Sequence, residues 1–225
     1  MNMKWTEKLG YAFIFSIVIA GVIMSHTHQK FYEGVYTRED GFVEWLTVFG
    51  LLAGAATCFY RAKVLAKFRS PIFILGLVGM GFIFIFGAGE EISWGQRIFD
   101  WQVPSFFAKN NSQGETNLHN LVVGGTKINK LFFGLILGIC VAIYFLIVPV
   151  LYRKFEKLKN LIDRFAIPIP KNSHIAAYLL LFGLSQIING HKPGEILEFG
   201  GCWIFYLMIL EPLNRPLFSR KSFNR

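Results

Sequence analysis

Apolar residues gather in six long runs along the chain, separated by short polar segments. Each run has, or nearly has, the ~20 residues with which a helix crosses the ~30 Å hydrocarbon core of a bilayer. The runs are continuously apolar, which argues against a transmembrane β-barrel and predicts helices that satisfy their own backbone hydrogen bonds. The predicted spans are Leu9–Ser25, Phe42–Tyr60, Pro71–Gly89, Leu131–Leu151, His174–Ile188 and Ile196–Leu213, and the fifth is the shortest. The predicted fold class is therefore all-α, a polytopic membrane helix bundle that forms one domain over residues 1–225.

Composition supports lipid as the main solvent of this fold. Of the residues, 53% are hydrophobic and only 16% are charged, whereas a soluble domain has about 25% charged residues. Lys4 and Lys8 precede the first run as they would in a signal peptide. That run is long, however, and residues 24–28 (MSHTH) offer no cleavage site between small residues. The sequence therefore predicts a retained first span.

Basic residues lie in clusters between alternate runs, and this pattern predicts the orientation. Most of the 23 Lys and Arg fall on one side, which the positive-inside rule makes cytoplasmic. Most of the 14 acidic residues fall on the other side or just inside its boundary. Both termini are then cytoplasmic, and in a bacterium the protein would lie in the inner membrane. The clusters are Lys4 and Lys8; Arg61, Lys63, Lys67 and Arg69; Arg153, Lys154, Lys157, Lys159, Arg164 and Lys171; and Arg215, Arg220, Lys221 and Arg225.

The net charge of +9 has a second interpretation, nucleic-acid binding. Membrane topology explains the clusters of basic residues better. A nucleic-acid partner is therefore not expected, and membrane lipid is the expected partner. Cys58, Cys140 and Cys202 all lie inside apolar runs with no metal-pair spacing, which is typical of small buried side chains.

The longest non-cytoplasmic segment runs from residue 90 to residue 130. Its first part, Glu90 to Trp101, has aromatic residues at helical spacing, which predicts either a continuation of the third span or an interfacial helix. Lys109–Glu115 is predicted to be a loop.

Acidic residues stand near the non-cytoplasmic ends of three spans. Glu44 lies about one turn inside the second span, deeper than a residue that only complements a helix dipole. Glu90 and Glu91 end the third span, where adjacent like charges oppose the dipole and need a cation, a proton or a metal. Arg97 would share a face with Glu90 if the helix continued, so an Arg-paired structural cluster is the alternative interpretation.

A second group of candidates comes from the long segment and the sixth span. His119 is flanked by Asn117 and Asn120. It is either a metal ligand or general base, or an exposed residue in a helix that Asn117 caps. Glu195 and Glu198 share a helix face, and Glu198 should point into the bundle because a lipid-facing carboxylate is costly.

These residues define one predicted site at the non-cytoplasmic face. Carboxylate and imidazole groups suit Zn, Mn or Fe, although no close-spaced ligand motif is present. Trp94 and Trp101 would line a lipid entrance. The predicted catalytic residues are Glu90, Glu91, His119 and Glu198, with Glu44 secondary. The predicted substrate-binding residues are Trp94, Gln96, Arg97, Asn117 and Asn120. The predicted metal ligands, for a divalent ion such as Zn, are Glu91, His119, His191, Glu195 and Glu198.

The strings EDGFVEW, GEEISWGQRIF and ETNLHNL, which extend from Glu39 to Leu121, resemble those of an uncharacterised bacterial family of multi-pass membrane proteins. This resemblance implies a shared fold and no known activity. The layout is faintly similar to alkaline-ceramidase-like membrane hydrolases. Their paired His motif on a late helix has no match here, so no catalytic residue carries over.

Three function classes follow from these observations. The first is a membrane enzyme, such as a metal-dependent hydrolase or transferase, that acts on a lipid or lipid-linked substrate at the outer leaflet. The second is a proton- or ion-coupled transporter that uses the same carboxylates, although no inverted repeat is visible. The third is a non-catalytic accessory protein. The sequence leaves the choice among them open.

Overall fold

The computed structural model describes residues 3–220, apart from the side chains at 126, 129, 130, 132 and 133. Lys221 and Arg225, two of the basic residues used to predict orientation, lie outside the described residues. Within them the fold is helical, and the only strands described form a two-stranded antiparallel hairpin of β1 (Val122–Val123) and β2 (Thr126–Lys127).

Five described helices are long and apolar enough to cross a membrane, which makes this a multi-pass integral membrane protein. They are α1 (Trp5–Thr27), α3 (Phe42–Leu65), α4 (Pro71–Glu91), the helical stretch Gly134–Lys154 and α11 (Pro193–Leu210). The stretch Gly134–Lys154 comprises the end of η3 (Asn129–Ile136), then α7 (Leu137–Ala142), η4 (Ile143–Ile147) and α8 (Val148–Lys154).

The predicted fifth span corresponds to α10 (Asn172–Gln186), which has only 15 residues. Six spans therefore stay a prediction. The remaining helices are short: α2 (Gln29–Phe31), η1 (Tyr32–Tyr36), η2 (Ser93–Gly95), α5 (Gln96–Phe99), α6 (Ser105–Asn110), α9 (Glu156–Arg164) and η5 (Arg215–Phe218).

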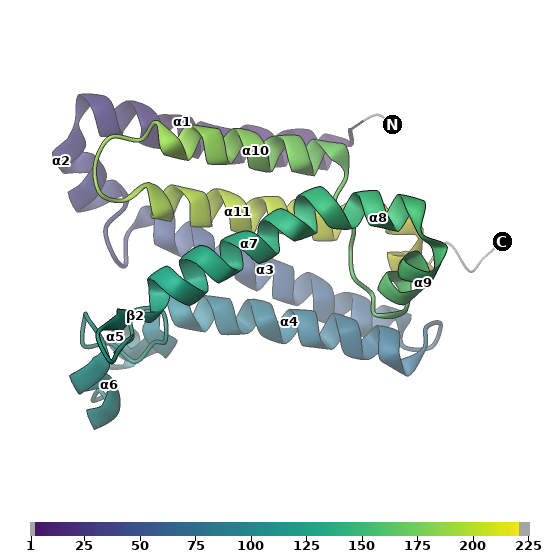
Figure 1. The fold of residues 1–225 in the computed structure, drawn as a ribbon, viewed down its shortest axis with the longest axis horizontal. Coiled ribbons are helices and arrows are strands. Elements are labelled where there is room, and N and C mark those ends of the chain that lie inside the picture. The colour runs from purple at the N-terminus through teal and green to yellow at the C-terminus, as the bar shows by residue number, and fades with distance from the viewer. Residues whose placement is uncertain (1–2, 221–225) are drawn as a thin grey trace.

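The long helices pack around α11. α3 packs against both α4 and α11, while α1 and α10 pack against each other and against α11 (Figure 1). The shared core includes Ile14, Phe199, Ile204 and Leu207, all buried. Small residues permit the close approach of helices: a Cβ atom added to Gly200 would lie only 2.5 Å from Leu181 of α10.

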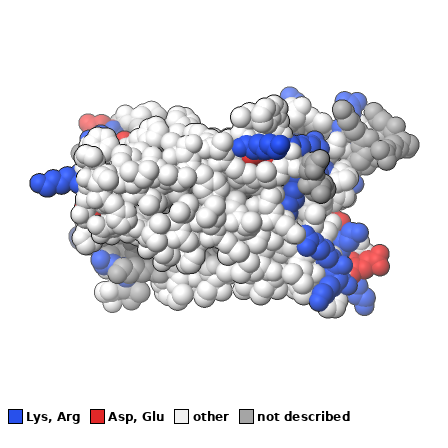
Figure 2. Space-filling model, turned by 90° about the horizontal axis from the view of Figure 1, so that it is seen from above, with Lys and Arg blue, Asp and Glu red and all other residues white. Residues whose placement is uncertain are grey.

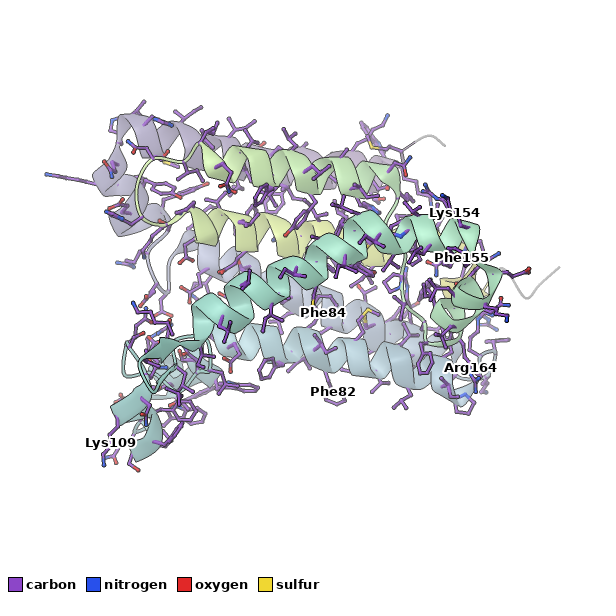
Figure 3. The ribbon with its side chains drawn as sticks, viewed as in Figure 1. Phe82, Phe84, Lys109, Lys154, Phe155 and Arg164 are labelled. Atoms are coloured by element: carbon purple, nitrogen blue, oxygen red, sulfur yellow. The ribbon has the colours of Figure 1, made fainter. Side chains whose placement is uncertain are left out.

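The outer surface of the bundle is apolar, as lipid requires. On α4, Phe82 is exposed and points away from the bundle, whereas Phe84 packs against the core (Figure 3). The stretch Gly134–Lys154 crosses the other helices diagonally and is largely exposed (Figure 1). This exposure is expected of a helix that faces hydrocarbon on most of its sides.

The two described chain ends lie at the same end of the bundle, opposite α5 and α6 (Figure 1). Lys and Arg side chains gather near the chain ends, and fewer are visible at the opposite end (Figure 2). We call these the terminal end and the cap end of the bundle.

The segment after α4 departs from the predicted continuous helix. α4 ends at Glu91, and the backbone then turns sharply, with positive φ angles at Ser93 (48°), Trp94 (55°) and Gly95 (81°). The prediction that Glu90 to Trp101 continues the third span is therefore wrong. Phe99 and Trp101 remain exposed beside the bundle, as expected of residues in the membrane interface.

Candidate functional site

Glu90 is an anchor for the chain that follows α4. Its side chain is buried, 4% exposed. Its Oε2 accepts hydrogen bonds from the backbone amides of Leu118 (2.6 Å) and His119 (3.0 Å), and its Oε1 accepts one from Trp94 Nε1 (2.9 Å). The structure thus brings the predicted residues Glu90 and His119 together, but through the His119 backbone. A catalytic role for Glu90 stays a prediction.

Arg97 joins the start of α3 to the loop that follows α6. Its Nε lies 2.5 Å from Asp40 Oδ2, and its Nη2 lies 3.5 Å from Glu44 Oε1. Its Nη1 also forms an ion pair with Glu115. Burial opposes the charge of Arg97, but the nearby carboxylates outweigh it and raise the pKa of Arg97 above its ordinary value. Arg97 thus neutralises three carboxylates other than Glu90 and Glu91, the pair that it was predicted to compensate.

Buried amides complete this network. Asn117 Nδ2 donates to Ser93 Oγ and to Glu115 Oε2, both at 2.9 Å. Ser93 Oγ donates in turn to Glu115 Oε2 at 2.7 Å. Asn111 Nδ2 donates to Asn117 Oδ1 at 2.9 Å. The alternative in which Asn117 caps a following helix is wrong, because bends and the β1–β2 hairpin follow it.

The other predicted substrate-binding residues also hold the loop. Gln96 Oε1 accepts a hydrogen bond from the Thr116 amide (2.7 Å), and Asn120 Nδ2 donates to Gln113 Oε1 (2.6 Å). Their role in binding substrate stays a prediction. Sequence reasoning missed Ser93, Asn111 and Glu115 as members of the network. Of these, Ser93 and Glu115 carried a signal, because they lie in the GEEISWGQRIF and ETNLHNL strings, whereas Asn111 carried none.

We call residues 93–121 the cap. His119 lies in the cap, and its side chain is partly exposed. Burial lowers the pKa of His119 below its ordinary value, although the nearby Glu90, Glu115 and Glu39 act in the opposite direction. The neutral imidazole is therefore favoured, and this form can accept a proton or bind a cation.

A second set of carboxylates meets where α3, α4 and α11 converge. Glu198 interacts electrostatically with Glu91, Glu195 and Glu44. Glu91 also interacts with Glu195 and Glu44, and with Glu90 next to it in the chain. The side chains of Glu91, Glu195 and Glu198 are half-buried. Within residues 3–220, none of these three carboxylates accepts a hydrogen bond or forms an ion pair. We call Glu91, Glu195 and Glu198 the acidic cluster.

Glu44 connects the two sets. It is buried, accepts a hydrogen bond from the Asp40 amide at 2.9 Å, and lies 3.5 Å from Arg97. Its partial pairing distinguishes it from the acidic cluster.

His191 lies apart from the acidic cluster. It is exposed, and its backbone amide donates to Glu33 Oε1 at 3.1 Å. Hydrogen bonds from Gln29 and from the His191 amide hold the pKa of Glu33 below its ordinary value. The described side chains contain no group of three or more His, Cys, Asp or Glu placed to hold a metal ion. The predicted metal set of Glu91, His119, His191, Glu195 and Glu198 is therefore not assembled in this conformation.

Carboxylates without partners at a membrane boundary have a limited set of chemical roles. Like charges in a low-dielectric environment repel one another, so such a group takes up protons or attracts a cationic ligand. The acidic cluster can therefore exchange protons with water or with a bound substrate.

Comparison with known proteins adds no functional evidence. No protein family, no curated protein and no solved structure matches the chain. The resemblance carried by the three strings stays an expectation.

Proposed function

We propose first that the chain crosses the membrane six times, with both termini in the cytoplasm and the acidic cluster at the opposite face. Two chain ends at the same end of the bundle require an even number of crossings, and α10 supplies the sixth (Figure 1). The basic residues at the terminal end support the cytoplasmic assignment (Figure 2). In a bacterium this is the inner membrane.

We propose further that the protein is an enzyme that performs acid–base chemistry on a lipid or lipid-linked substrate at the non-cytoplasmic leaflet. The observation that carries this proposal is that, among the described residues, Glu91, Glu195 and Glu198 accept no hydrogen bond and form no ion pair, although Lys192 lies close enough to Glu195 to act on its charge. The neighbouring carboxylates Asp40, Glu44, Glu90 and Glu115 are each hydrogen-bonded or ion-paired to the chain. Glu91, Glu195 and Glu198 therefore keep the capacity to serve a substrate.

The reaction class is hydrolysis or group transfer. One protonated carboxylate donates its proton to the leaving group, while a second, ionised carboxylate accepts a proton from water or from an acceptor hydroxyl. Trp94, Phe99 and Trp101 are exposed on the segment that follows Glu91 and α4. Aromatic residues of this kind favour the headgroup region, which suits a substrate held by its lipid tail.

A proton-coupled transporter is the second candidate. The observation that favours it is the staggered depth of the carboxylates on α11: Glu195 lies in the first turn and Glu198 one turn deeper. Such a pair can pass a proton along the helix.

Lipid turnover in nanodiscs tests the enzyme proposal. Purified protein is reconstituted with a bacterial lipid extract, and products are followed by mass spectrometry. We expect Glu198→Gln to lose at least about 100-fold in rate, since the amide keeps the size but cannot transfer a proton. Glu156→Gln on α9, at the other end of the molecule, is the matched control and should turn over lipid like the wild type.

The other outcomes assign the remaining classes. Proton flux into proteoliposomes without lipid turnover, abolished by Glu198→Gln, would replace the enzyme by a transporter. One equivalent of divalent metal in the purified protein would make metal-activated water the reactive group. Equal turnover by wild type and Glu198→Gln would remove the acidic cluster from the mechanism.

A further inference from the structure

The terminal end of the bundle holds a buried ionic cluster with no part in the proposed chemistry. Glu7 of α1 is only 1% exposed, and its Oε1 lies 2.9 Å from Lys171 Nζ. Its Oε2 accepts a hydrogen bond from the Lys4 amide at 3.1 Å. His174 of α10 is also buried, with its Nε2 3.5 Å from Glu7 Oε1. These contacts join the beginning of α1 to the beginning of α10.

A cavity of about 380 Å³ lies against this cluster. Its volume falls in the range of ligand sites, roughly 300–1,000 Å³. Two side chains on its wall are cationic, two are neutral and polar, two are apolar, and one is acidic. The lining residues are Arg153, Lys171, Asn172, Ser173, Met3, Leu213 and Glu7.

The wall has positive charge in excess. Glu7, the one acid of the lining, is bonded to Lys171, whose Nζ also lies 4.0 Å from Glu211 Oε2 outside the lining, so the excess charge of the wall lies on Arg153. Arg153 donates from Nη2 to Asn172 Oδ1 at 2.9 Å, and no described carboxylate lies within ion-pair distance of it. A guanidinium has five N–H donors, so Arg153 has donors left for an anion.

Helix geometry adds to this charge. Asn172 and Ser173 begin α10, a helix of 15 residues. The first amides of a helix lack partners within it and lie at the positive end of its dipole. The neutral polar side chains of these residues and the basic residues thus surround the same space.

The depth of the cavity in the bilayer indicates where its ligand comes from. Arg153 lies at the end of the helical stretch Gly134–Lys154, next to exposed Lys154 on α8 (Figure 3). That is the level of lipid headgroups, and the apolar side chains of Met3 and Leu213 offer contact to the glycerol and first methylenes.

We propose that this cavity binds the phosphate group of an anionic phospholipid from the leaflet at the terminal end. Arg153 and Lys171 hold the phosphate oxygens, Asn172 and Ser173 add hydrogen bonds, and the lipid joins α8 to the start of α10. Arginine suits this task because its planar donors match two oxygens of one phosphate. The site lies at the opposite end of the bundle from the acidic cluster and does not depend on the proposed enzyme activity.

Native mass spectrometry of the delipidated full-length protein in detergent tests this site. Dioleoyl-phosphatidylglycerol is titrated into the wild type, Arg153→Gln, Arg153→Lys and the control Arg164→Gln. Arg164 lies on α9 and is exposed, outside the cavity lining. We expect Arg153→Gln to weaken lipid binding about tenfold, Arg153→Lys to recover part of it, and Arg164→Gln to bind like the wild type.

Two further probes identify the source of the phosphate. Dioleoyl-phosphatidylcholine, which carries no net charge, should bind more weakly than phosphatidylglycerol. Inorganic phosphate that displaced the lipid at equal concentration would keep the phosphate site but assign it to a soluble ligand. Equal lipid binding by wild type and Arg153→Gln, with melting temperatures that show both to be folded, would overturn the proposal.

Discussion

Glu90 and Glu91 are neighbours in the chain but have opposite surroundings. An α-helix turns by about 100° for each residue, so the two side chains leave α4 in different directions. Glu90 turns toward the cap and accepts three hydrogen bonds. Glu91 lies within electrostatic reach of Glu198 of α11 and Glu44 of α3. One carboxylate is thus part of the architecture, and the other is available to a ligand.

This difference predicts opposite effects of substitution on stability. Glu90→Ala leaves the amides of Leu118 and His119 without their acceptor, and unsatisfied buried donors cost about 1–3 kcal/mol each. We expect a loss of about 3 kcal/mol in the free energy of unfolding. Glu91→Gln removes one of several repelling charges and should leave the melting temperature unchanged or higher. Thermal unfolding in detergent measures both, and equal destabilisation by the two variants would contradict the assignment.

At the scale of elements, the cap over residues 93–121 is held by polar bonds more than by an apolar core. Arg97 makes ion pairs with Asp40, Glu44 and Glu115 at once, and therefore fixes the cap to the start of α3. Buried Asn111 and Asn117 fill the space between. Such a network is sensitive to the loss of a single member, because each buried polar group depends on its partners.

Arg97→Lys tests this dependence on geometry. Lysine keeps the charge but cannot present planar donors to three carboxylates. We expect amide hydrogen exchange in residues 93–121 to become faster, while exchange within α3 and α4 stays slow. Arg97→Gln should have a larger effect and lower the free energy of unfolding by about 3–5 kcal/mol. The reason is that the charge of buried Glu115 is left without its cation.

The exposed Arg38 offers the control for this comparison. Arg38→Gln removes a positive charge from the same end of the molecule, and it should leave exchange in the cap unchanged. Faster exchange in all three variants would attribute the effect to net charge rather than to the ion pairs of Arg97.

The cap was also the part of the fold least accessible to sequence reasoning. Hydropathy predicted the long helices because the bilayer imposes a length and a composition on each. The turn after α4 has no such signal: Ser93 and Trp94 adopt positive φ angles, which cost L-residues about 1–2 kcal/mol each. Contacts from distant residues, such as Glu115 with Ser93, offset that cost. Helical spacing over Glu90 to Trp101 therefore favoured the wrong structure.

For the candidate site, the sequence predicted the level of the carboxylates in the membrane but not the direction of each side chain. Span boundaries place Glu44, Glu91, Glu195 and Glu198 at one level, and the structure brings these four within electrostatic reach of one another. Which of two adjacent carboxylates faces the cap depends on helix rotation, and one sequence does not specify it. His191 does not join these four, because the turn before α11 places its backbone amide beside Glu33, and its predicted role as a metal ligand stays a prediction.

At the scale of the whole molecule, the topology depends on α10, the shortest of the six proposed spans. With α10 as a crossing, the segments before and after it lie on opposite sides of the membrane, and both termini share one side. Without it, α9 and the turn that holds His191 would lie on the same side. The number of crossings can therefore be determined from two residues, Lys159 on α9 and His191 before α11. They lie on opposite sides of the membrane if α10 crosses it, and on the same side if it does not.

Cysteine labelling in intact cells tests this arrangement. In a background with Cys58, Cys140 and Cys202 replaced by Ala, single cysteines are introduced as Lys159→Cys, His191→Cys and Ser112→Cys. A maleimide that cannot cross the membrane should label positions 191 and 112 in intact cells, and position 159 only after permeabilisation. This pattern is expected because basic residues are retained in the cytoplasm, while α10, at 15 residues, has flanking polar residues that reach both interfaces. The same labelling of positions 159 and 191 in intact cells would remove α10 from the spans. Labelling of 159 but not of 191 or 112 would invert the whole molecule and place the acidic cluster in the cytoplasm.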